Sequence, residues 1–188
     1  MSFIEIKMAM DSFFAIDFWQ VGVIALFILG GIYLFLKIQE RKYGYPYSKM
    51  KMVCAVLLAV YVALLIGGTV FNRGVGQELR AELIPLWSYF QLFKEKNLNL
   101  LRQMISNVLV FIPWPILFAT VFPRMRRIWC GVGSAFVFSA TVETLQLVFQ
   151  IGLFEFDDMF HNTLGALIGF CIFSMFAKLR NKGKMEKL

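Results

Sequence analysis

The fold is decided by residues 128–150, which read IWCGVGSAFVFSATVETLQLVFQ. A helix needs about 20 apolar residues to cross the roughly 30 Å of hydrocarbon in a bilayer, and this run is long enough. Its one charged residue is Glu143. A charge at membrane depth costs on the order of a few kcal/mol, and carboxylates kept there usually serve a function. Glu143 is therefore the leading candidate for a functional residue.

Four further apolar runs have the length of a membrane span. They cover residues 18–36, 52–71, 104–122 and 159–177. The 188-residue chain is 59% hydrophobic, which is more apolar surface than a soluble domain of this length can bury. Backbone amides inside lipid must be hydrogen-bonded within their own segment, so the spans should be helices. We predict an all-α fold, a polytopic transmembrane helical bundle with about five spans.

The flanking segments predict how the chain is divided. Residues 18–177 are expected to form a single integral membrane domain. Residues 1–17 carry one Lys against three acidic residues, unlike the basic start of a cleaved signal peptide, and are predicted to be an outer tail. Residues 178–188 form a basic tail, which we expect to be cytoplasmic and to attract anionic lipid headgroups.

Positive charge is distributed unevenly among the predicted loops. If the N-terminus lies outside, the inner segments are 37–51, 123–127 and the C-terminal tail, and they hold 13 of the 19 Lys and Arg residues. An excess of positive charge on the cytoplasmic side favours this N-out, C-in topology. Topology thus accounts for the net charge of +7, and a nucleic-acid partner is not expected.

The long outer loop contains the apolar segment LIPLWSYFQLF at residues 83–93. It is too short to span a bilayer and too apolar for a solvated loop. Trp87 and Tyr89 are residue types typical of the headgroup boundary. We predict an interfacial segment here, which either caps the helices or contacts a lipid-linked partner.

Polar residues from three spans fall at one depth in this topology. Glu143, for example, lies about 10 Å below the outer edge of its span. A shared outer cavity is therefore expected. The ligand-binding candidates are Asn107, Glu143, Gln146, Asp157, Asp158 and Asn162, and the catalytic candidates are Glu143, Asp158 and His161.

Simpler roles stay open for these residues. Asp157 and Asp158 precede a span, where carboxylates cap free amides. His161 suits a wet interface, and Asn107 suits a hydrogen bond between helices. Glu143 is buried in its protonated form, pairs with a basic residue, or accepts bonds from amides. The candidate partners of Glu143 are Arg73, Arg80, Arg102, Gln146 and Asn162.

We predict no metal and no cofactor. A metal site of Glu143, Asp157 and His161 is chemically feasible, but their spacing does not demand one. The cysteines lie in apolar runs without ligand spacing, and we expect them to pack as small residues. They are Cys54, Cys130 and Cys171.

Helix-breaking and small residues predict a shaped interior. Pro113 and Pro115 lie in the middle of the third span, where they remove backbone hydrogen bonds and bend the helix. Gly165 and Gly169 lie four residues apart in the last span, a spacing typical of close helix packing.

Several of these motifs together resemble the VanZ-like family. They are NVLVFIP at 107–113, ETLQ at 143–146 and DDMFHNTLGALIG at 157–169, with LIPL at 83–86 similar to an upstream family element. The resemblance covers roughly residues 52–177. The family's polar positions carry over to Asn107, Glu143, Gln146, Asp158 and Asn162. Two departures are Leu153, where members commonly have a basic residue, and the pair Trp114-Pro115.

The resemblance implies a bacterial cytoplasmic membrane protein, and its founding member is associated with teicoplanin resistance. The first hypothesis is therefore a cell-envelope factor of Gram-positive bacteria. Its outer cavity binds a lipid-linked cell-wall precursor or a glycopeptide antibiotic, and membrane lipids are its surroundings. A second hypothesis is an enzyme acting on a lipid headgroup with Glu143 as general base. A third is a structural membrane partner protein.

Overall fold

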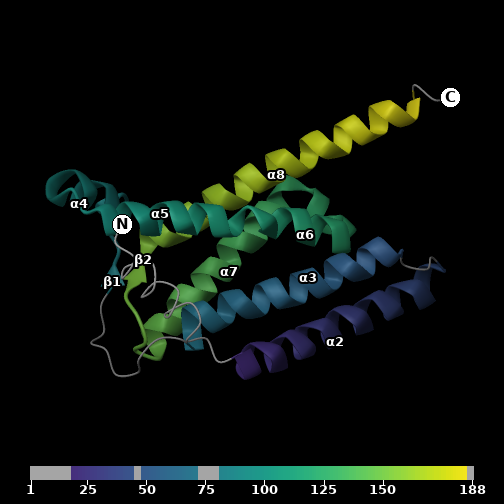
Figure 1. Ribbon diagram of the computed structural model, residues 1–188, viewed down its shortest axis with the longest axis horizontal. Coiled ribbons are helices and arrows are strands. Elements are labelled where there is room, and N and C mark those ends of the chain that lie inside the picture. The colour runs from purple at the N-terminus through teal and green to yellow at the C-terminus, as the bar shows by residue number, and fades with distance from the viewer. Residues whose placement is uncertain (1–17, 45–47, 72–80, 186–188) are drawn as a thin grey trace, which may run out of the picture. The chain divides into compact units, whose positions relative to one another are not determined.

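The computed structural model describes residues 18–44, 48–71 and 81–185, and these are almost entirely helical (Figure 1). The contacts divide the chain into two compact units. The first contains residues 1–78 and 148–152, and the second contains residues 79–147 and 153–188.

The first unit contains two long helices in contact. They are α2 (Phe18–Tyr43) and α3 (Lys49–Ile66), and α3 is followed by the π-helical turn η1 (Gly67–Phe71). Gly44 ends α2 in the left-handed conformation, with φ 71°. Ser48 begins α3, because its hydroxyl accepts a hydrogen bond from the amide of Lys51 at 3.3 Å.

Small residues form the buried face of α3. Ala55, Ala59 and Ala63 are spaced four residues apart, so they share one side of the helix, and each is at most 1% exposed. Ala63 packs with Val21 of α2. Short side chains let neighbouring helices approach closely, which is how helices associate in lipid.

The second unit holds all of the candidate polar residues. Its elements are β1 (Ala81–Glu82), α4 (Trp87–Glu95), α5 (Leu98–Phe111), α6 (Pro113–Val121), η2 (Pro123–Arg126), α7 (Ile128–Val148), β2 (Phe154–Glu155) and α8 (Phe156–Met185). The two short strands pair in parallel, with Ala81 opposite Phe154 and Glu82 opposite Glu155.

The third span is divided where the prolines predict. Helix α5 ends at Phe111 and α6 begins at Pro113, because proline has no amide hydrogen to continue the ladder. Ile112 between them keeps helical angles, φ −57° and ψ −43°, so the two helices continue as one span. Trp114 is 3% exposed and donates a hydrogen bond to the hydroxyl of Ser134 at 3.0 Å, which ties α6 to α7.

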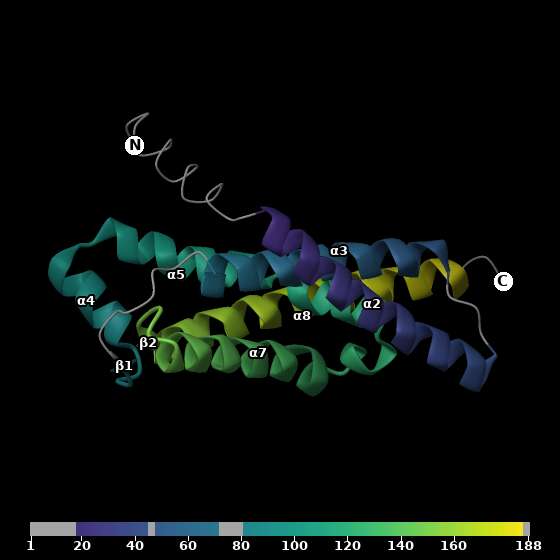
Figure 2. The same ribbon diagram turned by 90° about the horizontal axis from the view of Figure 1, so that it is seen from below.

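Helices α5 and α8 approach each other through glycine. A Cβ atom added at Gly165 would overlap the carbonyl oxygen of Val108, and one at Gly169 would overlap that of Ile112. The predicted small-residue face therefore packs backbone against backbone. The second contact lies four residues after the first in both α5 and α8, so the two helices run parallel. In Figure 2, α8 lies between α5 and α7.

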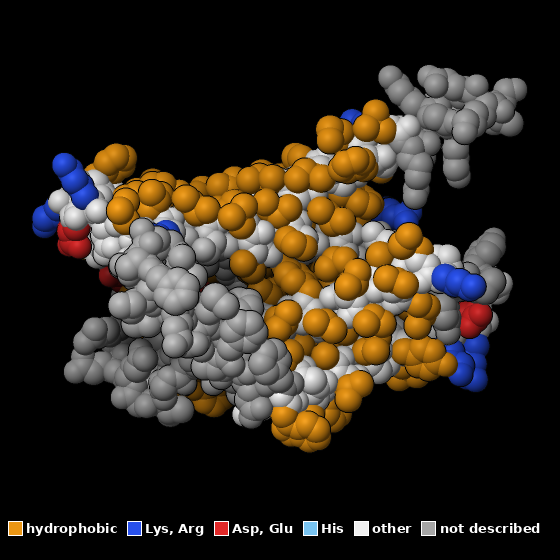
Figure 3. Space-filling view, in the orientation of Figure 1, with side chains coloured by type: hydrophobic (Ala, Val, Ile, Leu, Met, Phe, Trp, Pro, Cys, Tyr) orange, Lys and Arg blue, Asp and Glu red, His pale blue; other side chains and the backbone are white. Residues whose placement is uncertain are grey.

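Five helical stretches are long and apolar enough to cross a membrane within the described residues. They are Trp19–Tyr43, Lys49–Val70, Leu98–Val121, Ile128–Val148 and Phe156–Leu179. On the face drawn in Figure 3, hydrophobic side chains cover the sides of the long helices, whereas charged side chains gather at helix ends. The all-α fold and the five predicted spans are confirmed. The orientation in the membrane and the division into tails and one domain stay predictions.

Candidate functional site

The site lies at one end of the second unit, where α8 begins. Its second residue, Asp157, is 3% exposed and accepts two backbone hydrogen bonds from the α4 region. The amide of Leu86 donates to Oδ1 at 2.7 Å and the amide of Ser88 donates to Oδ2 at 2.8 Å. Leu86 occupies the N-cap position of α4 but has no side chain that can cap. Asp157 therefore caps α4 from another helix, and its negative charge faces the positive end of that helix dipole.

His161 holds α4 at a second point. The ring is 1% exposed, and its Nε2 lies 3.0 Å from the hydroxyl of Tyr89. The two rings also contact each other, with centroids 5.5 Å apart. The other ring nitrogen, Nδ1, is buried and has no hydrogen-bond partner among the described residues.

Glu143 lies on α7 and is 4% exposed. Its Oε2 accepts a hydrogen bond from the backbone amide of Glu155 at 3.0 Å, so the buried carboxylate stabilises the strand β2 that precedes α8. The side chain of Glu155 in turn accepts a bond from Gln103 of α5 at 2.8 Å. Gln146, one turn from Glu143 on α7, is 2% exposed. The hydrogen bonds of Glu143, Glu155 and Gln103 together connect α5, α7 and β2.

Asn162 connects α8 to α7. Its Nδ2 donates to the hydroxyl of Ser139 at 2.8 Å, and its own side chain is 9% exposed. Its Oδ1 is buried without a hydrogen-bond partner in the described part of the chain. Nδ2 of Asn107, on α5, is also buried and has no hydrogen-bond partner among the described residues. Buried polar atoms are nearly always paired in native proteins, so these atoms need an explanation.

The polar residues of α5, α7 and α8 lie at a similar position along the helix axes. Val108 meets Gly165, which places Asn107 within about one turn of His161 and Asn162. Helix α7 reaches the same level through the contacts of Ser139 and Glu143 described above. We call this group the polar cluster, and its residues are Asn107, Ser139, Glu143, Gln146, Asp157, His161 and Asn162.

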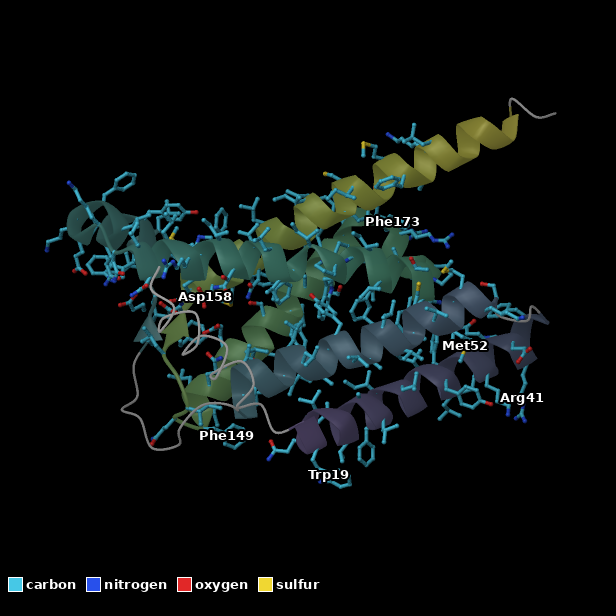
Figure 4. All side chains as sticks on the ribbon, in the orientation of Figure 1. Trp19, Arg41, Met52, Phe149, Asp158 and Phe173 are labelled. Atoms are coloured by element: carbon cyan, nitrogen blue, oxygen red, sulfur yellow. The ribbon has the colours of Figure 1, made fainter. Side chains whose placement is uncertain are left out.

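The structure places most of the predicted candidates in the polar cluster. Asp158, at the start of α8, is only partly buried, and Figure 4 labels its position. Arg102 donates to Asn99 at 3.4 Å within α5. The other basic residues proposed as partners of Glu143 are Arg73 and Arg80, and they lie outside the described residues. The roles of all these residues in ligand binding or catalysis stay predictions.

Sequence reasoning missed two members of the site. Ser139 precedes Glu143 by one helical turn, so the same-face spacing that linked Glu143 to Gln146 would have found it. Tyr89 was expected only at the headgroup boundary. Its contact with His161 spans 72 residues of sequence, and no local pattern predicts such a pairing.

Among the described residues, no three His, Cys, Asp or Glu side chains come together as a metal site requires. The chemistry of the polar cluster is instead that of hydrogen bonding by amides, hydroxyls, an imidazole and two carboxylates.

The comparisons with known proteins agree on one family. The VanZ/LLP1 family model matches residues 52–177, which include every span except α2. The chain is also similar to Protein VanZ of Enterococcus faecium, with 27% identity over 146 residues that cover 73% of this chain and 84% of the relative. No solved structure matches. With the match covering the helices that build the polar cluster, the chain belongs to the VanZ/LLP1 family.

Proposed function

We propose that this protein lowers the susceptibility of a Gram-positive bacterium to teicoplanin-type glycopeptides. It acts in the cytoplasmic membrane as a cell-envelope factor, and its polar cluster faces the outer leaflet. There it binds a lipid-linked or amphiphilic ligand. Membership of the VanZ/LLP1 family supports the resistance role. The observation that carries the binding role is the buried cluster of polar side chains at one end of three packed helices.

The surface beside the polar cluster suits an amphiphilic ligand. Helix α4 is attached to the cluster through Asp157 and His161, and it exposes large apolar side chains. Phe90 is 54% exposed and Phe93 is 81% exposed. A ligand with an acyl chain and a polar headgroup would find an apolar surface and hydrogen-bonding groups within one helical turn of each other.

The bonds of the two buried carboxylates favour binding over catalysis. A general base must be free to take a proton from the substrate. Both oxygens of Asp157 and one oxygen of Glu143 accept backbone hydrogen bonds that stabilise α4 and β2. Both carboxylates therefore stabilise neighbouring backbone, and this structural use favours a binding role over that of a general base.

The first experiment is a teicoplanin and vancomycin susceptibility assay. A sensitive Gram-positive host expresses the wild type, Glu143→Gln or the exposed control Glu95→Gln, at matched membrane levels. Glutamine keeps an oxygen that accepts the Glu155 amide but is not a base. We expect selective protection against teicoplanin by the wild type, the control and Glu143→Gln.

The outcomes separate the hypotheses. Loss of protection only in Glu143→Gln would support the catalytic alternative. No protection by well-expressed wild type would contradict the resistance role and leave the structural-partner alternative. Equal protection against both antibiotics would contradict the teicoplanin selectivity.

A further inference from the structure

Three polar atoms of the polar cluster lack a hydrogen-bond partner among the residues that the structure describes. They are Nδ2 of Asn107, Nδ1 of His161 and Oδ1 of Asn162. His161 is 1% exposed and Asn162 is 9% exposed, so solvent at the protein surface does not satisfy these two side chains. An unpaired buried polar atom costs about 1–3 kcal/mol, so a group that forms hydrogen bonds with these atoms would bind with a gain in free energy.

The three residues lie at one level along two helices that are in contact. Gly165 of α8 touches Val108 of α5, so these two residues mark the line of closest approach. His161 and Asn162 precede Gly165 by four and three residues, which places both on the same side of α8. Asn107 directly precedes Val108. Along the helix axes, all three residues therefore lie within about one turn of this contact, toward the end where α8 begins.

The other atoms of these side chains define what the partner must supply. Nδ2 of Asn162 is already bound to Ser139 and Nε2 of His161 is already bound to Tyr89. Asn107 therefore offers a donor and Asn162 offers an acceptor. His161 Nδ1 offers either, because the tautomer decides which ring nitrogen carries the proton. The complementary group must both accept and donate.

We infer that the polar cluster binds an uncharged hydroxyl or carboxamide group of its ligand, seated between Asn107, His161 and Asn162. This inference rests on the proposed function and names the part of the ligand that is recognised. An oxygen of a phosphodiester accepts but does not donate. An ammonium donates but does not accept. Sugar hydroxyls and amides do both.

The depth of the site fits such a group. His161 follows the first residue of α8 by five positions, which corresponds to about 7–8 Å along the helix. In the predicted topology α8 begins at the outer edge of its span, so a group beside His161 lies about 7–8 Å below that edge. The first sugar or the linking amide of an acylated glycoconjugate would reach this level while its chain stays in lipid.

The single histidine of the chain provides the test. The full chain is labelled with ¹⁵N-histidine and reconstituted in nanodiscs of dioleoylphosphatidylcholine. The two imidazole nitrogen signals are followed while one of three probes is added: diglucosyldiacylglycerol, teicoplanin or dihexadecyl phosphate, an anionic phosphodiester without a hydroxyl group. We expect the first two to shift the Nδ1 signal saturably and dihexadecyl phosphate to leave it unchanged. A shift with only one of them identifies a sugar lipid or the antibiotic as the source.

Variants locate the contact. Asn107→Leu and Asn162→Leu keep the side-chain size and remove the donor or the acceptor. We expect each to weaken the apparent affinity roughly three- to tenfold, the equivalent of one hydrogen bond. Asn99→Leu is the matched control, because Asn99 lies on α5 at an exposed position, and it should bind as the wild type does. If a variant does not fold, the wild-type titration alone decides.

Two results would overturn the inference. A shift produced by dihexadecyl phosphate alone would show an anion site. No shift with any probe, at probe levels of tens of mole per cent, would show an internal water only. Teicoplanin protection without an Nδ1 shift would contradict this site but not the resistance role. A shift without protection would contradict the resistance role but not the site.

Discussion

At the scale of single residues, the acidic side chains stabilise neighbouring backbone. Asp157 precedes the body of α8, and capping of its own helix was the simplest expectation. It caps α4 instead, because Leu86 at the N-cap position cannot accept a hydrogen bond. Leu86 also has φ 64°, a left-handed conformation that is unfavourable for leucine. The bond from its amide to Asp157 compensates part of that cost.

Substitution of Asp157 should therefore loosen α4 before it disturbs the long helices. Asp157→Ala removes both acceptors, and we expect it to lower the free energy of unfolding by about 1–2 kcal/mol, the usual cost of a lost cap. Asp157→Asn keeps one acceptor and should lose less. The check is backbone amide exchange at Ser88, with thermal unfolding in detergent micelles. Unchanged exchange at Ser88 in Asp157→Ala would contradict the capping role.

At the scale of elements, the second unit depends on one close helix contact. The α5–α8 pair has no room for a methyl group at Gly165 or Gly169, because carbonyl oxygens of α5 occupy that space. Close approach of this kind replaces the hydrophobic effect, which does not drive helices together inside lipid. The same contact sets the level of Asn107 relative to α8.

Gly165→Ala and Gly169→Ala should separate α5 from α8. We expect each to lower the free energy of unfolding by about 1–3 kcal/mol, the cost of overpacking a filled site. Gly133→Ala is the control within the same unit, since a Cβ there meets nothing within 4 Å. It should be neutral or stabilise the helix by up to about 1 kcal/mol. Equal behaviour of all three variants in a denaturant titration would contradict the close packing.

Helix α4 yields a second prediction at this scale, because its exposed aromatic face is expected to lie at the membrane surface. We expect Trp87 fluorescence to be quenched more by lipids brominated near the headgroup than by lipids brominated deep in the chain. The measurement uses a background in which Trp19, Trp114 and Trp129 are phenylalanine, checked for folding by circular dichroism. Stronger quenching by the deep label, or no quenching by either label, would contradict the location of α4 at the membrane surface.

At the scale of the whole molecule, the sequence predicts the spans but not their partners. Each span follows from local composition, and the break at Pro113 and the glycine face of α8 follow from the known chemistry of those residues. The pairing of Asp157 with Leu86 and of His161 with Tyr89 does not, because 71 and 72 residues of chain separate the partners. The distance of each polar residue from the end of its predicted span indicated that these residues lie at a similar depth. Which atoms would bond could not be predicted, since it depends on helix register.

Orientation is the remaining whole-molecule prediction, and cysteine labelling tests it. In a background with Cys54, Cys130 and Cys171 changed to alanine, we expect Lys94→Cys to react with an impermeant maleimide on intact cells. Arg124→Cys should react only after the membrane is permeabilised. Both positions are exposed, so differences in burial do not confound the result. The reverse pattern would place the polar cluster in the inner leaflet.

The capping of α4 by Asp157 also has a consequence for biosynthesis. Synthesis runs from the N-terminus, so the Leu86 and Ser88 amides emerge long before the carboxylate that binds them. Glu143 likewise precedes its partner Glu155. During insertion α4 stays uncapped until the last span is made, and the arrival of that span completes α4, the short strand pair and the polar cluster together. A nascent chain that stops before residue 157 has its first four spans but no site.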